Sequence, residues 1–332
     1  MSARISPIPF VFRICQLGGL LVILILAVAL GGGAGADEKA TQAADAAPGK
    51  TDEAQKTEDR ADDAERPGAK WVRLLKSAAG DPLAMQTAIV RYVKPGKHAD
   101  AGAPVTVDLI GAIHVGDEEY YRRLNKRFED YDALLYELVA PEGAVIEKGR
   151  GTSNAHPVGA LQNGLKSFLD LEHQLEHIDY TQKNFVHADM SPEQFSQTMK
   201  DRGESFMQMY FRLMGQELAR QSQQQAQGTQ FELFAAFFSS DRNRRLKIAL
   251  ANQFEDMEAM LAGFGGPDGS TIITERNRVA LEVLSRQINE GKRKLGVFYG
   301  AGHLADMDKR LREEFGLEPV KVTWLDAWNL RP

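Results

Sequence analysis

The feature that most constrains the fold is a short apolar segment from Asp132 to Val139, which is closed by Ala140 and Pro141. An apolar run of this length that stops at a proline predicts a β-strand buried on both faces, as in a parallel sheet. Glu137 lies near the end of the run, although burying a carboxylate is costly unless the charge is paired or used. The segment therefore predicts an α/β fold with an ionisable group at the carboxyl end of a central strand.

Two other segments repeat this arrangement with a histidine as the ionisable group. The segment from Val105 to Ile110 leads into Gly111-Ala-Ile-His114, and the segment from Leu295 to Tyr299 leads into Gly300-Ala-Gly-His303. A single Gly-x-x-His motif is better explained by a histidine that caps the next helix. Ligands of open α/β sheets bind at the carboxyl ends of the strands, so two copies together with the glutamate predict one shared site. Glycine lets the backbone approach a ligand closely, and a helix N-terminus favours an anion.

The N-terminal residues 1–36 have the features of a signal peptide, with an apolar stretch from Leu17 to Leu30 followed by Ala34-Gly35-Ala36. Cleavage after this site gives an exported protein, periplasmic or extracellular, and is the favoured interpretation. The alternative is that residues 14–36 remain as a membrane anchor, because their length could span a bilayer.

The rest of the chain divides into residues 37–70, predicted to be a disordered acidic linker, and residues 71–332, predicted to be the folded domain. A formal net charge of −6 gives no reason to expect nucleic acid as a partner. Cys15 is the only cysteine and lies in the signal segment, which excludes a cysteine nucleophile in the folded domain.

The order of elements predicts a central mixed β-sheet with flanking helices. Residues 85–93 and 105–110 form a predicted antiparallel hairpin. Asp117 is the predicted N-cap of a helix that ends near Tyr131, and the strand that carries Glu137 follows directly, which favours a parallel pair.

Residues 143–269 have helical spacing almost throughout and predict a large all-helical insertion over one end of the sheet, with Ser191 as one helix cap. The chain then returns to α/β, with a helix from Ser270 to Glu290 that stops at Gly291. A strand over residues 294–299, a helix that stops at Gly316 and a strand over residues 320–325 are predicted to follow.

Arg276 lies on the predicted buried face of the helix that begins at Ser270, and Asn277 lies beside it. A guanidinium on a buried face needs a carboxylate or an anionic ligand, and Glu137 is a candidate partner. The alternative is a structural ion pair without catalysis.

A second histidine motif is His173-Gln-Leu-Glu176-His177, which matches the inverted zinc-protease pattern. On an amphipathic helix the same spacing arises by chance, and we expect these side chains to be solvated. His187 and Asp189 form a weaker polar pair that is a candidate to line the site.

Gly111-Ala-Ile-His114, Tyr136-Glu137, Glu275-Arg276-Asn277 and Gly300-Ala-Gly-His303, taken in this order, resemble the motifs of the TraB/Tiki family, also called GumN-type. That family is grouped by fold with the erythromycin esterases and the haem-binding ChaN proteins. The resemblance covers about Met85 to the C-terminus. It implies a metal-dependent hydrolase, with peptidase activity known for the Tiki branch, whose functional histidines and glutamate match His114, His303 and Glu137.

The resulting hypothesis is an exported metallopeptidase-like hydrolase that acts on a peptide or small molecule and uses a divalent metal ion (Mn, Co or Zn). The expected catalytic residues are His114, Glu137, Arg276 and His303; the expected metal ligands are His114, Glu137 and His303; and Gly111, Gly300 and Asn277 are expected to contact the cofactor. In this mechanism Glu137 is a ligand or general base, and Arg276 holds it or stabilises the oxyanion. Two alternatives remain: a metal-independent, erythromycin-esterase-like hydrolase with a histidine base, and a protein that binds haem or another ligand through His114 or His303.

Overall fold

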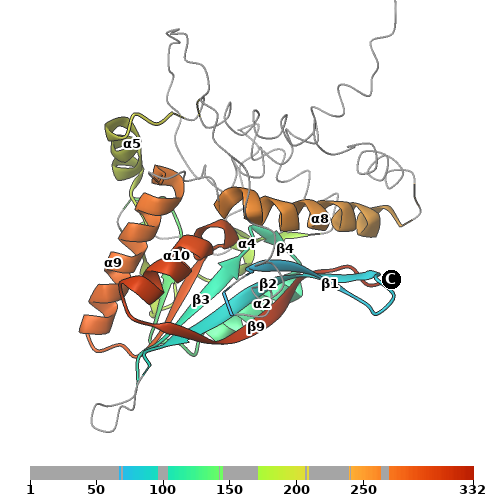
Figure 1. Cartoon of the computed structure of the whole chain (residues 1–332), viewed down its shortest axis with the longest axis horizontal. Coiled ribbons are helices and arrows are strands. Elements are labelled where there is room, and N and C mark those ends of the chain that lie inside the picture. The colour runs from blue at the N-terminus through green and yellow to red at the C-terminus, as the bar shows by residue number, and fades with distance from the viewer. Residues whose placement is uncertain are drawn as a thin grey trace, which may run out of the picture.

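The structure is a computed structural model that describes residues 67–68, 70–95, 104–141, 143–144, 171–205, 208, 239, 241–262 and 269–332, with 253–262 described as backbone only. A mixed β-sheet forms its centre, and helices pack against it (Figure 1). The predicted α/β class and mixed sheet are confirmed.

The main sheet of the described residues has the strand order β1-β2-β3-β8-β5-β7, and β9 pairs with β2 as well. Neighbours among β1, β2, β3 and β9 are antiparallel, whereas β3, β8, β5 and β7 run parallel to one another. The strands are β1 (Val72–Lys76), β2 (Pro82–Val93), β3 (Thr106–Ala112), β5 (Ala133–Tyr136), β7 (Phe185–His187), β8 (Lys294–Gly300) and β9 (Glu318–Asn329). A separate small pair joins β4 (Val115–Gly116) to β6 (Glu172–His173).

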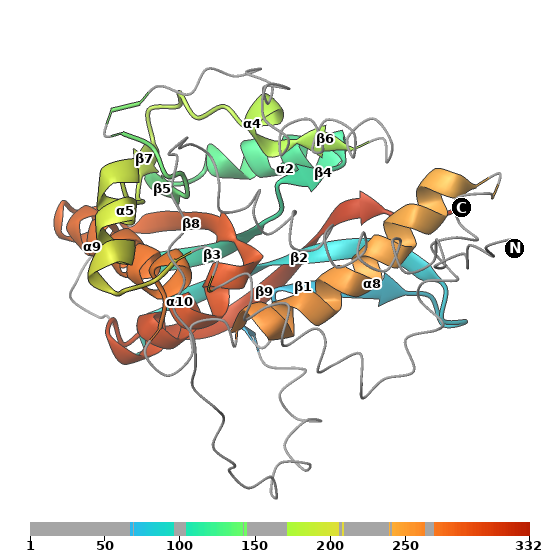
Figure 2. The same ribbon diagram turned by 90° about the horizontal axis from the view of Figure 1, so that it is seen from above.

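Helices cover both faces of the main sheet. One face packs against α2 (Glu118–Phe128), and the other packs against α9 (Arg276–Asn289) and α10 (Ala301–Glu313) (Figure 2). Buried apolar side chains form a core cluster on each face, as expected for an α/β layer structure. The other described helices are α4 (Gln174–His177), α5 (Pro192–Asp201), α8 (Arg242–Ala262) and the π-helical turn η1 (Thr271–Glu275).

The alternation of side chains along β5 decides which face Glu137 joins. Leu134 and Tyr136 belong to the core on the α2 face, while Ala133 and Leu135 belong to the core on the α9–α10 face. Successive side chains of a strand point to opposite faces, so the next residue, Glu137, continues the α9–α10 face. The helices that carry Arg276 and His303 lie on that face.

The predicted helix caps at two serines are confirmed. Ser191 and Gln194 form a complete capping box at the start of α5, and the Ser270 hydroxyl accepts a hydrogen bond from the backbone N–H of Ile273. Gly291 follows the end of α9 with a φ of 94°, in the left-handed region that glycine adopts without strain. Between Ser270 and α9 the chain makes the π-helical turn η1, a feature that is frequent at functional sites.

The antiparallel hairpin is confirmed as β2 and β3, but three other predictions differ from the structure. The strands before and after α2 run parallel without pairing, because β8 lies between β3 and β5. Asp117 occupies the N-cap position of α2 without capping it, since its carboxylate accepts hydrogen bonds from Lys247 Nζ and the Asn329 backbone N–H instead. The segment 143–269 is not all helical, because it contains β6 and β7, and β7 extends the main sheet.

Several predictions concern residues outside the described ranges. These are the signal segment 1–36, nearly all of the linker 37–70, and large parts of the insertion 143–269. Within the described ranges, no helix is both long enough and apolar enough to cross a membrane.

Candidate functional site

The candidate site lies at the carboxyl ends of the parallel strands. Ala112 of β3 is level with Gly300 of β8, and Tyr136 of β5 is level with Phe298 of β8. His114 and Glu137 follow the ends of β3 and β5, and β8 leads directly into the first turn of α10, which carries His303. The sheet therefore brings three separate sequence motifs to one edge, as expected from the strand pattern.

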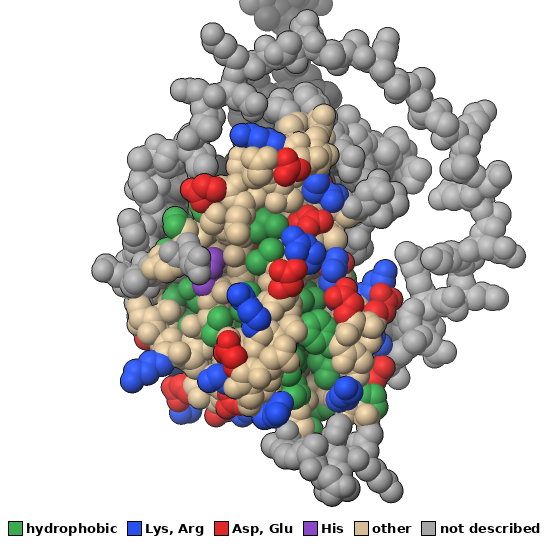
Figure 3. Space-filling view, turned by 90° about the vertical axis from the view of Figure 1, so that its left-hand side faces the viewer, with side chains coloured by type: hydrophobic (Ala, Val, Ile, Leu, Met, Phe, Trp, Pro, Cys, Tyr) green, Lys and Arg blue, Asp and Glu red, His purple; other side chains and the backbone are tan. Residues whose placement is uncertain are grey.

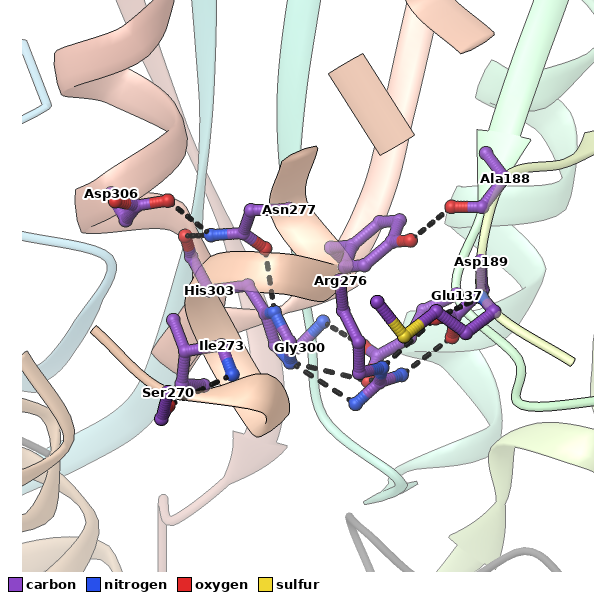
Figure 4. Close-up of polar contacts among 12 residues, drawn as sticks. Glu137, Ala188, Asp189, Ser270, Ile273, Arg276, Asn277, Gly300, His303 and Asp306 are labelled. Atoms are coloured by element: carbon purple, nitrogen blue, oxygen red, sulfur yellow. Dashed lines mark hydrogen bonds and ion pairs between the residues drawn. The ribbon is translucent and has the colours of Figure 1, made fainter. Parts of the chain in front are cut away.

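Arg276 is the centre of the cluster, and it is paired with two carboxylates (Figure 4). Its Nη2 donates to Glu137 Oε1 at 2.7 Å, while Nε and Nη2 donate to the two oxygens of Asp189 at 2.9 and 2.5 Å. The side chains of Arg276 and Asp189 are 2% and 0% exposed, so water does not screen this ion pair. Burial alone would lower the pKa of Arg276, but Glu137 and Asp189 together raise it, so the guanidinium is fully charged.

His303 is held at both ring nitrogens. Nδ1 lies 2.7 Å from Asn277 Oδ1, and Nε2 lies 3.4 Å from Glu137 Oε1 and 3.5 Å from Arg276 Nη1. Asn277 also donates through Nδ2 to the His303 backbone carbonyl and to Asp306 Oδ2, each at 2.9 Å (Figure 4). The ring is buried, so its orientation is fixed by these contacts and not by solvent.

Glu137 is an ionised carboxylate in a buried position. Burial alone would raise its pKa, but nearby His303 and Arg276 hold the pKa well below its ordinary value. Oε2 also accepts the Gly300 backbone N–H at 2.6 Å, at the N-terminal end of α10. Two carboxylates and one guanidinium leave a formal charge of −1 when the histidines are neutral. This surplus of negative charge favours a cation at the cluster.

His114 is half-buried at the end of β3 and belongs to the same electrostatic environment. Burial lowers its pKa, and the charge of Glu137 opposes this effect, whereas Arg276 and His303 add to it. The backbone of His114 is fixed because its carbonyl accepts the Gln174 N–H at 2.9 Å. The charges of the cluster therefore act on His114. Its ring nitrogens, however, do not make the kind of direct contact with Glu137 and Arg276 that His303 Nε2 makes.

The two motif glycines have different roles. A Cβ on Gly300 would lie 3.2 Å from Glu137 Oε2, so glycine allows the backbone N–H to reach the carboxylate. A Cβ on Gly111 would lie 3.2 Å from the Ala88 carbonyl and 3.5 Å from Leu304 Cδ1. Gly111 thus allows β2 and α10 to pack closely, and its contact with a cofactor stays a prediction.

The sequence-predicted metal ligands only partly converge. His303 Nε2 and Glu137 Oε1, 3.4 Å apart, are near enough to bind one ion. Among the described residues, however, the group of three acidic or histidine side chains whose ligand atoms all lie within 4.8 Å of one another is Glu172, Glu176 and His177. His114 does not complete such a group with Glu137 and His303.

The group formed by Glu172, Glu176 and His177 differs from the predicted His-x-x-Glu-His motif. Its members are half-buried, and His177 Nε2 lies 3.2 Å from Glu172 Oε2. His173, which the motif requires, is 6% exposed and lies in β6, opposite Val115. The expectation that His173 is solvated is therefore wrong. His173 is also not a member of the group that contains His177, so the two histidines of the motif do not converge on one metal site.

Asp189 is the site residue that sequence reasoning left unassigned. It follows β7, whose three residues pair with β5, and this pairing places it beside Arg276. Its companion His187 instead hydrogen-bonds through Nε2 with the Leu138 carbonyl at 2.7 Å. The only sign of this role in the sequence was that Asp189 is a polar residue just after a short apolar segment. β7 has three residues, which is too few to show the alternation that identifies a strand.

The buried cluster differs from the charges on the outside of the molecule. On the face that includes α5 and α9, acidic and basic side chains are interspersed with hydrophobic ones (Figure 3). Arg278, two positions after Arg276, illustrates these surface charges because it pairs with Glu275 and Glu282 while half exposed. Exposed pairs of this kind contribute little to stability.

Fold and site together define an α/β protein with a buried histidine–carboxylate–arginine cluster at the carboxyl edge of its parallel strands. The chain matches no protein-family model, no curated protein and no solved structure. The likeness to the TraB/Tiki family therefore rests on the four motifs alone.

Proposed function

We propose that the protein is a hydrolase of the TraB/Tiki type that acts on a peptide or small molecule. The observation that carries this proposal is the arrangement at His303, whose Nε2 lies beside both a buried carboxylate and a buried guanidinium. An imidazole in this position can take a proton from an attacking water. A guanidinium 3.5 Å from the same nitrogen can stabilise an oxyanion that develops next to it.

In the metal-dependent form of this proposal, His303 Nε2 and Glu137 Oε1 would hold a divalent ion. His114, which does not complete a three-ligand group with them among the described residues, would have to come closer to serve as the third ligand. The donors at His303 and Glu137 fit such an ion, and the hydrogen bond between Asn277 Oδ1 and His303 Nδ1 would orient the imidazole toward it. A divalent ion would supply Lewis acidity and lower the pKa of a bound water. Asp189 would keep Arg276 in place while Glu137 serves the ion.

A metal-independent hydrolase is the second candidate, and one specific observation favours it. Arg276 Nη2 already binds Glu137 Oε1 at 2.7 Å, and a divalent ion at that oxygen would lie against a positive charge. In this form His303 is the general base, Glu137 stabilises the imidazolium that results, and Arg276 stabilises the oxyanion.

The haem-binding alternative fits the site less well. An iron ligated by His303 Nε2 would place the porphyrin where the Glu137 and Arg276 side chains lie, 3.4 and 3.5 Å from that nitrogen. Two buried charges would then face an apolar macrocycle, which is costly. An absorption spectrum of the purified protein with a Soret band would nevertheless restore this alternative.

The test is a screen for hydrolysis of peptide and ester substrates by the purified protein, with and without a chelator. Activity that the chelator abolishes and Mn²⁺, Co²⁺ or Zn²⁺ restores supports the metal-dependent form. Activity that survives the chelator and disappears in His303→Gln supports the metal-independent form. Equal turnover in wild type and His303→Gln, with His177→Ala as the matched control, would refute both.

A further inference from the structure

The amide of Asn277 has one orientation that its neighbours permit. Its Nδ2 side faces two acceptors, the His303 backbone carbonyl and Asp306 Oδ2, each 2.9 Å away. Turning the amide over would set its carbonyl oxygen against both acceptors and leave three oxygen atoms without a hydrogen between them. Arg310 Nε also donates to the same Asp306 oxygen at 2.9 Å, so this oxygen is an acceptor for both side chains. Asn277 Oδ1 therefore faces the imidazole of His303.

An amide oxygen only accepts hydrogen bonds, so the nitrogen 2.7 Å from it, His303 Nδ1, carries the proton. We infer that Asn277 is a positioning residue that locks neutral His303 in the Nδ1–H tautomer and leaves a lone pair on Nε2. The inference rests on the proposed function, in which Nε2 is the working nitrogen.

Without Asn277 the opposite tautomer would have the advantage. Glu137 Oε1 lies 3.4 Å from Nε2 and, as a carboxylate, accepts an N–H from that nitrogen more strongly than a neutral group does. An Nε2–H tautomer would satisfy this contact but would have no lone pair for a proton or a metal ion. Asn277 thus opposes the attraction of Glu137, and Arg276 Nη1, 3.5 Å from Nε2, is a donor that suits the lone pair.

The start of α9 explains how one helix controls both sides of the ring. Arg276 and Asn277 are consecutive residues at the junction between η1 and α9, and both are buried. Neighbouring residues of a helix point about 100° apart, so Arg276 approaches the Nε2 side while Asn277 approaches the Nδ1 side. The tautomer and the electrostatic environment of His303 are thereby fixed by a single turn of helix.

The tautomer can be measured directly, without a substrate, from the 15N signals of the imidazole in histidine-labelled protein at a pH where the ring is neutral. A chelator is present so that no metal decides which nitrogen is protonated, and loss of the signal in His303→Gln assigns it. The expected result for wild type is a protonated Nδ1 and an unprotonated Nε2. A protonated Nε2 in wild-type protein would overturn the inference, whatever the behaviour of any variant.

Two variants separate the amide oxygen from packing. Asn277→Leu removes the acceptor and should move the His303 signal toward the Nε2–H form, while Asn277→Gln retains both the amide donor and the amide acceptor and should keep Nδ1–H. Asp306→Asn, which leaves the Asn277 oxygen in place, is the control and should keep the wild-type tautomer. A wild-type signal in Asn277→Leu, or a full shift in Asp306→Asn, would contradict the assignment.

Turnover distinguishes this inference from the proposed function. Loss of an orienting partner should lower turnover about 10- to 100-fold in Asn277→Leu and less in Asn277→Gln. The Nδ1–H tautomer in a protein that hydrolyses nothing would refute the function and leave the role of Asn277 intact. Hydrolysis by a protein whose His303 is in the Nε2–H form would refute the role of Asn277 and leave the protein a hydrolase.

Discussion

Replacing Glu137 by glutamine tests whether this carboxylate is needed for chemistry or for folding. The variant keeps the shape of the side chain and removes its charge. In the structure Glu137 accepts hydrogen bonds from Arg276 Nη2 and the Gly300 N–H, so the change weakens both. Arg276 keeps its two hydrogen bonds to Asp189, and the guanidinium is not left alone.

The size of the stability loss follows from this second carboxylate. Stranding a buried charge costs about 3–5 kcal/mol, whereas a single hydrogen bond to a charged group contributes about 1.5–3 kcal/mol. Glu137→Gln weakens the hydrogen bonds to Arg276 and Gly300 and also relieves the desolvation of a buried carboxylate. We therefore expect a loss of about 1–2 kcal/mol for Glu137→Gln. Asp189→Asn affects two hydrogen bonds of the guanidinium while Glu137 remains as its charged partner, so its loss should be larger, about 2–3 kcal/mol, but below the cost of a stranded charge.

The pH dependence gives an independent check. The pKa of Glu137 is well below its ordinary value in the folded protein, so the unfolded chain binds a proton first as the pH falls. Its contribution to stability is complete above the unfolded pKa of about 4.3 and is lost as the pH falls from there through the folded pKa. Below about pH 4.3, unfolding should therefore depend less on pH in Glu137→Gln than in wild type.

The free energy of unfolding is measured by chemical denaturation of wild type, Glu137→Gln and Asp189→Asn with a chelator present. Turnover is measured separately on native aliquots of the same three preparations with metal restored. Turnover should fall about a hundredfold or more in Glu137→Gln if the carboxylate serves a water or a metal ion. Full turnover in Glu137→Gln would refute its catalytic role. A stability loss greater than that of Asp189→Asn would refute the assignment of Asp189 as the principal partner of Arg276.

Three further predictions address other parts of the molecule. His303→Ala should remove bound metal measured by elemental analysis while Glu172→Gln with His177→Ala should not, and the opposite pattern would move the metal site to that group. Ser270→Ala should destabilise the protein by about 1 kcal/mol in denaturant melts, because a hydroxyl cap of the η1 turn is lost, and an unchanged midpoint would count against the cap. We propose export with cleavage after Ala36, so N-terminal sequencing of the mature protein should begin at Asp37, and an intact N-terminus in the membrane fraction would support the anchor instead.

The strand ends and the Gly-x-x-His motifs could be predicted because their signals are local. An apolar run that stops at a glycine or proline identifies both a buried strand and its carboxyl end. The burial of Arg276 could also be predicted, from its place on the apolar stripe of a helix. These local signals were sufficient to predict that Glu137, Arg276 and His303 would meet.

The order of the strands and the partners of each atom could not be predicted in the same way. Pairing of β8 between β3 and β5 depends on contacts between residues far apart in the chain, which no local pattern reports. Asp189 depends on a strand of three residues, and the role of Asn277 depends on which of its two amide atoms faces His303. The sequence indicated that Asn277 lies near the site. Its effect on the tautomer of His303 follows only from the contact between Asn277 Oδ1 and His303 Nδ1.

The position of β8 between two strands that precede it by more than a hundred residues has a consequence for how the protein folds. Until β8 is inserted, β3 and β5 each present an unpaired edge; β5 consists of apolar residues, and β3 is apolar except for Thr106 and Asp108. Contacts of such long sequence separation form slowly, and exposed apolar edges invite association between chains. A chain that stops short of β8, or that is slow to insert it, should therefore aggregate. Since β8 also leads into His303, the reactive cluster is absent until that gap in the sheet is filled.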